Sequence, residues 1–143
     1  MHRIVLTFCL LLTVTLMVAV TGCSSSPKTS DQDLVQLEYP SLLKLQADPK
    51  VKLVIVDVRS AQRYATGHIP HAINISIPDL HPADERLADA TDIVVYATGW
   101  TEYLSPAAAK KLLSQNYKNV HDFRGGVEMW QAYGGKVTPG VTP

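Results

Sequence analysis

Apolar residues in this chain gather into short runs that are separated by polar turns. The two runs richest in β-branched residues, Val51–Val58 and Ile93–Tyr96, do not alternate with polar residues, which is typical of strands covered on both faces of a parallel sheet. Weaker runs predict two more strands, Ala72–Ile77 and Val120–Phe123. Helical segments are predicted from Tyr39 to the Asp48-Pro49 pair, over Ala61–Ala65, over Ala107–Gln115 and over Val127–Tyr133, with one further turn around Ala83–Leu87 in the polar stretch Pro78–Ala90. Strands that alternate with helices predict an α/β fold with a parallel sheet.

The segment Ala97–Leu104 connects the strand Ile93–Tyr96 to the helix that follows it. Ser105 is predicted to be the N-cap of that helix, because its hydroxyl can accept a hydrogen bond from a free amide, and Pro106 suits the first helical position. In open α/β sheets, ligands bind beyond the carboxyl ends of the strands, where a helix N-terminus presents free amides to an anion. Ala97–Leu104 is therefore the predicted ligand site.

The N-terminal residues 1–22 have the order of a secretory signal peptide, in which a basic start precedes the apolar run Ile4–Val20. An uncleaved membrane anchor is the alternative, since a run of 17 residues lies at the short limit of a membrane span. The end of this segment, Val20-Thr21-Gly22-Cys23, resembles the bacterial lipobox. That resemblance implies acylation of Cys23, with palmitate as one such chain, and hence a lipid anchor on a membrane of the cell envelope. Ser24 after the cysteine implies the outer membrane, with the domain facing the periplasm.

Residues 23–33 are predicted to be a flexible linker, because Ser24–Asp33 is polar and has no apolar periodicity. The folded domain is then expected over residues 34–143. The cysteines of the chain are Cys9, inside the signal, and Cys23, which acylation would consume. The mature domain would therefore contain no disulfide, no cysteine-bound zinc and no cysteine nucleophile.

The charge of the mature chain is close to neutral. Loss of Arg3 with the signal leaves 12 Lys and Arg residues against 13 Asp and Glu residues, a formal charge of −1. Without a basic cluster, this composition gives no electrostatic reason to expect binding to nucleic acid. No cofactor is expected either.

Four stretches resemble the rhodanese family in their order and spacing. They are Asp57-Val58-Arg59, Tyr64–Ile75, Val94-Val95-Tyr96 with the loop that follows, and Phe123–Trp130. The resemblance spans Leu34 to about Val137, and it implies one rhodanese-like domain with a parallel sheet flanked by helices on both faces.

In active members of that family, the residue after the central strand is a cysteine that receives sulfur as a persulfide, and loop amides and often an arginine hold the anionic donor. The corresponding residue here is Ala97, which has no atom able to carry sulfur. The loop also resembles a longer variant with a second cysteine five residues later, and this position is Glu102. No Arg or Lys lies between Ala97 and the helix, and the Glu102 carboxylate would repel an anion.

Two enzyme activities and a non-enzymatic carrier function are the alternatives to a partner-binding role. A loop hydroxyl could act as nucleophile, but no His or Lys lies beside the candidates Thr98, Thr101, Tyr103 and Ser105 to activate one. Glu102 could act as a general base on water, although a solvated carboxylate is the commoner case. A carrier that binds a sulfur compound without covalent capture would need positive charge from Arg59 or Arg63.

Other chemically suggestive residues have structural interpretations. Asp57 and Arg59, at the end of a buried strand, are expected to form an ion pair or hydrogen-bond network. Gly125-Gly126 fits a tight turn into the last helix, and Trp130 is predicted to lie in the core. His68 and His71, with His81 and His121, invite a metal hypothesis, but Pro70 and the family's structural turn argue against it, and no metal is predicted. His71 stands where the family usually has glycine.

Two large aromatic residues, Trp100 and Tyr103, lie in the predicted loop. They could recognise a partner protein of the envelope or an apolar ligand, or they could fold back and fill the empty site. The loop predicted to bind a ligand or partner consists of Thr98, Gly99, Trp100, Thr101 and Tyr103. The sequence thus favours a membrane-tethered, catalytically degenerate domain that binds a partner, with sulfur transfer as the alternative.

Overall fold

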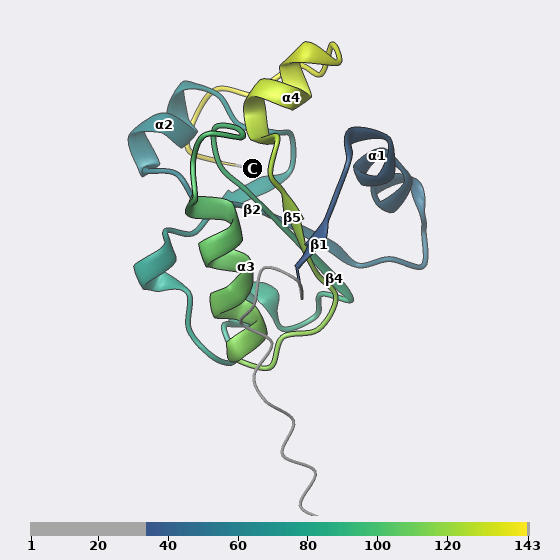
Figure 1. Cartoon of the computed structure of the whole chain (residues 1–143), viewed down its shortest axis with the longest axis vertical. Coiled ribbons are helices and arrows are strands. Elements are labelled where there is room, and N and C mark those ends of the chain that lie inside the picture. The colour runs from purple at the N-terminus through teal and green to yellow at the C-terminus, as the bar shows by residue number, and fades with distance from the viewer. Residues whose placement is uncertain (1–33, 143) are drawn as a thin grey trace, which may run out of the picture.

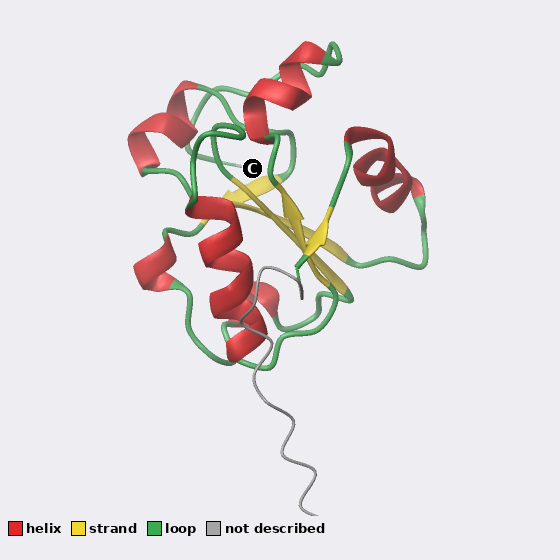
Figure 2. Ribbon diagram, viewed as in Figure 1, coloured by secondary structure: helices red, strands yellow, loops and turns green. Residues whose placement is uncertain are grey.

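The computed structural model describes residues 34–142, and their core is a parallel sheet of five strands. Neighbouring strands follow the order β1-β5-β4-β2-β3, so the strand before the candidate loop, β4, lies in the centre. Figure 2 shows the sheet as one yellow layer with red helices around it. The strands are β1 (Val35–Gln36), β2 (Leu53–Asp57), β3 (Ala72–Asn74), β4 (Asp92–Tyr96) and β5 (Val120–Phe123).

Helices cover both faces of this sheet, as the sequence predicted. In Figure 1, the strands run between α3 on one side and α1 on the other. The α-helices are α1 (Tyr39–Ala47), α2 (Ala61–Thr66), α3 (Leu104–Ser114) and α4 (Gly126–Ala132), and the 3₁₀ turns are η2 (Ile77–Asp79) and η3 (Glu85–Leu87).

The core consists of two apolar clusters, one on each face of the sheet. On the α3 face, Ala108 and Leu112 pack over Val95 and Val120. The opposite cluster contains Leu42 of α1, Tyr64 of α2, Val127 and Trp130 of α4, and Ile55, Val94 and Phe123 of the sheet. The unbroken apolar runs of β2 and β4 are explained by this double cover, because side chains on both faces of these strands are removed from water.

Several element boundaries differ from the sequence prediction. The predicted strand Ala72–Ile77 ends at Asn74, and after two residues without regular structure the chain enters η2. The edge strand β1 was not predicted at all, because two exposed residues carry no periodic signal. β1 forms by pairing Val35 and Gln36 with the distant strand β5.

The predicted start of α3 was also wrong. The helix begins at Leu104 with Tyr103 as its N-cap residue, and no side chain caps it. The reason is that the Tyr103 carbonyl already accepts the first helical hydrogen bond, from the amide of Ala107 at 3.2 Å. Ser105 therefore lies inside the first turn, where it is buried and its hydroxyl has no hydrogen-bond partner among the described residues.

The predicted signal peptide, the predicted acylation site Cys23 and the predicted linker lie outside the described residues. Among residues 34–142, no helix has the length and apolar character that a membrane span requires.

Candidate functional site

The loop Ala97–Tyr103 follows the carboxyl end of β4 and is hydrogen-bonded to the start of α4. The amide of Val127 donates to the carbonyl of Ala97 at 3.1 Å, and the amide of Glu128 donates to the carbonyl of Thr98 at 2.9 Å. The first turn of α4 thus binds the loop through the backbone. The predicted loop Ala97–Leu104 is present, one residue shorter because α3 begins earlier.

Gly126 makes this close approach possible. Its φ angle is +56°, and a Cβ atom there would lie 2.3 Å from the Ala97 carbonyl oxygen. Only glycine adopts this backbone conformation without strain and leaves the space that the loop carbonyl occupies. The prediction of a tight turn at Gly125-Gly126 is confirmed, and the structure adds that the turn contacts the candidate loop.

Ala97 itself is almost completely buried, with 1% of its surface exposed. It belongs to the apolar cluster under α3, with Val95 and Ala108. The methyl group at the end of the central strand is therefore part of the core.

An ion pair between two distant segments closes the loop. Arg63 of α2 donates from Nη1 to Glu102 Oε1 at 2.6 Å and to Thr98 Oγ1 at 3.1 Å. The second carboxylate oxygen of Glu102 accepts the backbone amide of Thr98 at 3.1 Å. Burial alone would raise the pKa of Glu102, but the hydrogen bonds from Thr98 and Arg63 outweigh it, and the pKa is lowered. Glu102 is thus an ionised, hydrogen-bonded part of the loop and not a freely solvated side chain.

The outer side of the loop is aromatic and exposed. Trp100 is 51% exposed and Tyr103 is 83% exposed, and the neighbouring Leu104 is also exposed. The alternative in which these rings fold back into the site is therefore wrong. Thr101 is exposed as well, whereas Gly99 is buried against Glu128, where an added Cβ would meet the carboxylate.

The predicted ion pair between Asp57 and Arg59 is present close to the start of the loop, since Asp57 pairs with Tyr96 at the end of β4. Arg59 Nη2 donates to Asp57 Oδ2 at 2.6 Å and to the Gly67 carbonyl at 2.7 Å. Burial alone would lower the pKa of Arg59, and the hydrogen bonds and charge of Asp57 reverse this and raise it. The Arg59 guanidinium also lies 5.8 Å from the centre of the Tyr96 ring. Arg59 is buried, and its Nε and Nη2 groups are bound by Asp57 and the Gly67 carbonyl, so its charge is largely compensated within the fold.

Tyr96, the last residue of β4, links this network to the turn before β3. Its hydroxyl accepts the amide of Ile69 at 3.0 Å. Burial, followed by the charge of Asp57, raises the pKa of the Tyr96 hydroxyl, so the group stays neutral at any physiological pH. The network fixes the carboxyl ends of β2 and β4 relative to each other.

The histidines lie apart. His68 is buried and stacks on Tyr64 at 3.9 Å between ring centres, with Nδ1 3.2 Å from the Tyr64 carbonyl. His81 and His121 each approach an aspartate, Asp84 and Asp92 respectively. Within residues 34–142, no three His, Cys, Asp or Glu side chains come close enough to hold a metal ion.

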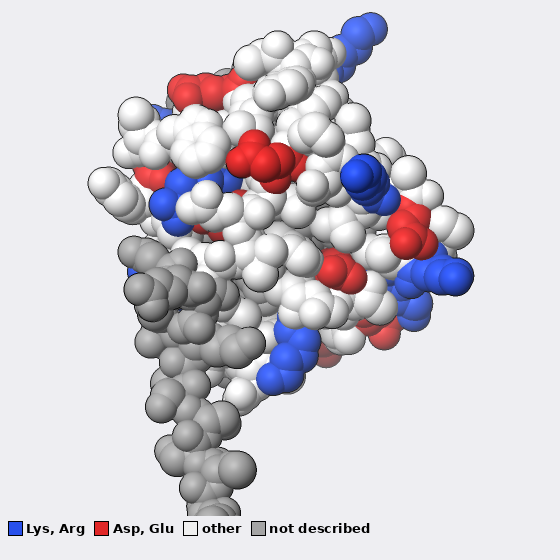
Figure 3. All heavy atoms as spheres, turned by 45° about the vertical axis from the view of Figure 1, so that its right-hand side comes forward, with Lys and Arg blue, Asp and Glu red and all other residues white. Residues whose placement is uncertain are grey.

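Trp130 lies in the core as predicted, and its indole Nε1 donates to the Lys136 carbonyl at 2.9 Å. Figure 3 shows that, on the face it presents, basic and acidic side chains are interspersed among larger uncharged areas.

The comparisons with known proteins identify the family. A model of the rhodanese-like domain matches residues 39–133. The chain belongs to the rhodanese-like domain family. A curated relative, the thiosulfate sulfurtransferase GlpE of Pseudomonas entomophila, is 38% identical over 92 residues, which are 61% of this chain and 79% of the relative.

Solved structures of the rhodanese-like fold superpose on the chain. The BH2092 protein of Bacillus halodurans is 26% identical, with a TM-score of 0.65 over 75% of this chain and 78% of that protein. The rhodanese-like domain of the Alr3790 protein of Anabaena sp. is 31% identical, with a TM-score of 0.54 over 68% of this chain and 95% of that domain.

The roles of two residues in the site became visible only in the tertiary structure. The sequence suggested Arg63 as a possible source of charge, but not that it would pair with Glu102, 39 residues away. Glu128 was not singled out, and its contact with Gly99 follows from the packing of α4 against the loop. No local pattern marks either contact, because each joins elements that are distant in the sequence.

Proposed function

We propose that this protein is a rhodanese-like domain without sulfur transfer chemistry that serves as a binding module of the bacterial cell envelope. The observation that carries the proposal is the identity of Ala97. A persulfide intermediate needs a thiolate at the end of the central strand, and a buried methyl group has neither a lone pair nor an ionisable proton. No residue between 24 and 143 is a cysteine, so no other thiol of the domain could replace it.

The charges around Ala97 also argue against an anionic sulfur donor. The Thr98 amide and the Arg63 guanidinium are two groups that could bind an external anion, and both already bind the carboxylate of Glu102. Glu128 adds a second carboxylate on the other side of the loop, against Gly99. An incoming anion that used these two donors would have to displace the Glu102 carboxylate with the Glu128 carboxylate nearby.

A binding role is supported by the outer surface of the loop. Trp100, Tyr103 and Leu104 expose apolar surface in one short segment, and charged residues, Arg63 and Glu102, lie beside them. Exposed aromatic residues surrounded by polar groups are typical of the centres of protein interfaces. The occupant would be a protein or an apolar ligand of the envelope.

Acylation of Cys23 would anchor this module to a membrane. Ser24 favours the outer membrane, where the domain would face the periplasm. The test is incorporation of labelled palmitate, followed by membrane fractionation. Labelling should be lost in the Cys23→Ser variant, and persistence of the label in that variant would exclude Cys23 as the acylated residue.

The loss of chemistry is tested by sulfur transfer from thiosulfate to cyanide. In this assay, a thiolate attacks the outer sulfur of thiosulfate, sulfite leaves and a persulfide remains, and cyanide then removes the sulfur as thiocyanate. We expect no thiocyanate above background from the wild-type chain. Ala97→Cys, alone and combined with Glu102→Arg, tests whether the loop still supports the reaction, and Ala97→Ser is the matched control without sulfur.

Sulfur transfer by the wild-type chain is the second candidate function, which the name of the Pseudomonas entomophila relative favours. Wild-type activity in the same assay would overturn the proposal and would require a sulfur acceptor other than residue 97. An active Ala97→Cys variant beside an inactive wild type would support a domain in which the nucleophile alone has been lost.

The binding role is tested by site-specific photocrosslinking in intact cells. A photoreactive phenylalanine analogue replaces Trp100 in one variant and Tyr133 in the control, because Tyr133 is a comparably exposed aromatic residue elsewhere on the surface. We expect one discrete product from position 100 that Tyr103→Ala diminishes, and none from position 133. Equal products from both positions would contradict a specific surface at the loop.

A further inference from the structure

A pocket of about 240 Å³ opens on the α1 face of the sheet, away from the candidate loop. It is lined by Leu45 and Gln46 of α1, by Val51, Leu53 and Ile55 along β2, and by His71 in the turn before β3. Leu53 pairs with Asp92, the first residue of β4, whereas the loop follows the last residue, Tyr96. The two sites therefore lie toward opposite ends of the central strands.

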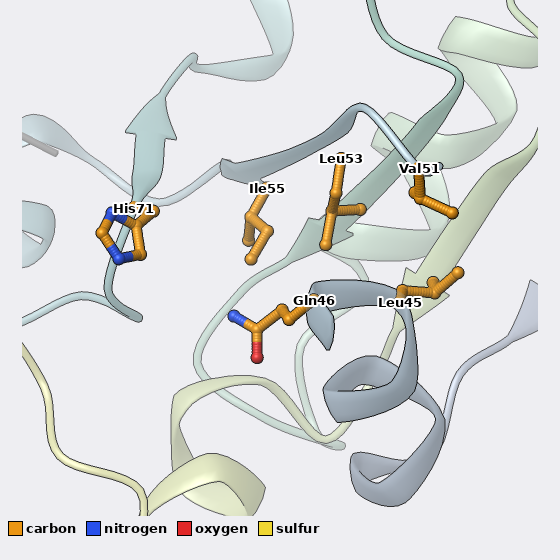
Figure 4. Close-up of a pocket in the computed structure, with 6 residues that line it drawn as sticks. All are labelled: Leu45, Gln46, Val51, Leu53, Ile55 and His71. Atoms are coloured by element: carbon orange, nitrogen blue, oxygen red, sulfur yellow. The ribbon is translucent and has the colours of Figure 1, made fainter. Parts of the chain in front are cut away.

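The pocket has an apolar body and two polar groups at its side. Figure 4 shows Val51, Leu53 and Ile55 in a row, with Gln46 reaching from α1 below Ile55 toward the side on which His71 lies. Within residues 34–142, neither the Gln46 amide group nor the His71 imidazole has a hydrogen-bond partner in the protein. Both side chains can donate hydrogen bonds to a bound molecule.

His71 has a backbone conformation that is unfavourable for residues other than glycine. Its φ angle is +66°, in the left-handed region that glycine adopts freely and a histidine adopts at a cost. This is also the position where the sequence resemblance leads one to expect glycine. Residues kept in unfavourable conformations concentrate at ligand sites, so a strained histidine beside a pocket calls for a functional reason.

The segment 44–52, which contributes to one wall of the pocket, carries a net positive charge. Residues 44–52, which include the pocket residues Leu45, Gln46 and Val51, carry three lysines and one aspartate. Among the described residues, Lys44, Lys50 and Lys52 form no ion pair, and the aspartate, Asp48, accepts the backbone amide of Lys50. A negatively charged group at the mouth of the pocket would meet an attractive potential.

We propose that this pocket binds a small monocarboxylate with an apolar tail. A volume of 240 Å³ holds about eight water-sized groups at roughly 30 Å³ each, fewer than a drug-sized ligand needs. The tail would lie on Leu53 and Ile55, and the carboxylate would accept hydrogen bonds from Gln46 and His71. This site is independent of the function proposed for the loop.

The probe is hexanoate, which has eight non-hydrogen atoms, titrated against the full chain in phospholipid nanodiscs with methyl and imidazole NMR signals as the readout. Acetate and 1-hexanol are the matched probes for the head and the tail. We expect saturable binding of hexanoate with a millimolar Kd, shifts of the Leu53, Ile55 and Val51 methyl signals, and at least fivefold weaker binding of both matched probes. Empty nanodiscs report partition of the probe into lipid.

The matched variants are His71→Gly and Asn116→Gly. Both remove a residue with positive φ, but Asn116 does not line the pocket. Both should raise the melting temperature, and only His71→Gly should weaken hexanoate binding, by at least fivefold, as Gln46→Ala should. Absence of saturable binding, equal binding of 1-hexanol, or unchanged binding by His71→Gly and Gln46→Ala would each overturn the proposal.

Discussion

Arg63 donates a 2.6 Å hydrogen bond to the carboxylate of Glu102 and thereby ties α2 to the loop that follows the central strand. The same carboxylate accepts the Thr98 amide, so a side chain of the loop already binds two donors that an anionic ligand could use. In this rhodanese-like domain, the residue after the central strand is an alanine, and a carboxylate lies beside it. These two features together support the proposed binding role over sulfur transfer.

The Arg63–Glu102 pair should make stability depend on pH. Because the pKa of Glu102 is below its ordinary value of 4.5 in the folded protein, the ionised form stabilises the fold above that pH. This contribution is lost as the pH falls from about 4.5 through the folded pKa. Since Arg63 is 58% exposed, we expect less than about 1 kcal/mol, measured as the difference in free energy of unfolding between wild type and Glu102→Gln. A difference that does not shrink between pH 7 and pH 3 would contradict the assignment.

Breaking the buried pair beneath the site should cost far more. Asp57→Asn removes the charge that compensates the buried guanidinium of Arg59, and such a loss costs about 3–5 kcal/mol. Urea unfolding would measure it, with the exposed Asp89→Asn as control. If both variants unfold at the same urea concentration, Asp57 does not hold the network together.

The glycine under the loop can be compared with a glycine elsewhere. Gly126→Ala places a methyl group 2.3 Å from the Ala97 carbonyl oxygen in addition to the strain of a positive φ. Gly134→Ala has positive φ too, but no atom lies within 4 Å of the added Cβ. We expect about 1 kcal/mol of destabilisation for Gly134→Ala from backbone strain alone, and clearly more for Gly126→Ala. Thermal unfolding of the two variants measures the difference, and equal losses would mean that the loop moves away without cost.

The aromatic residues of the loop should contribute little to folding. Trp100→Ala and Tyr103→Ala remove exposed rings, and we expect changes of no more than about 0.5 kcal/mol in the free energy of unfolding. Trp130→Ala is the buried counterpart, which loses core packing and its bond to the Lys136 carbonyl, at about 3–5 kcal/mol. Denaturant unfolding separates the two cases. A loss above 2 kcal/mol at Trp100 would return that ring to the core and remove it from the binding surface.

The sequence was informative wherever the physical signal was local. The runs in β2 and β4 predicted buried strands because both faces had to be apolar, and Gly126 predicted a turn because few residues accept positive φ. The prediction that Ser105 is the N-cap of α3 was wrong. A Ser-Pro pair suits an N-cap, but the helix starts where the carbonyl of Tyr103 accepts the first helical hydrogen bond. A cap signal gives a preference, and the packing of the preceding loop decides which residue takes the position.

The chain by itself thus determined the α/β fold, the family and the alanine at the end of the central strand. The fold class follows from hydrophobic periodicity, the family from the resemblance of four stretches, and the alanine from the identity of one residue. Only the tertiary structure decided that Arg63 meets Glu102, that Trp100 and Tyr103 face outward, and that a pocket lies between His71 and Gln46. Each of these relationships joins segments far apart in the sequence or depends on which surface remains uncovered. Such relationships exist only after the helices have packed onto the sheet, and no local pattern of residues encodes them.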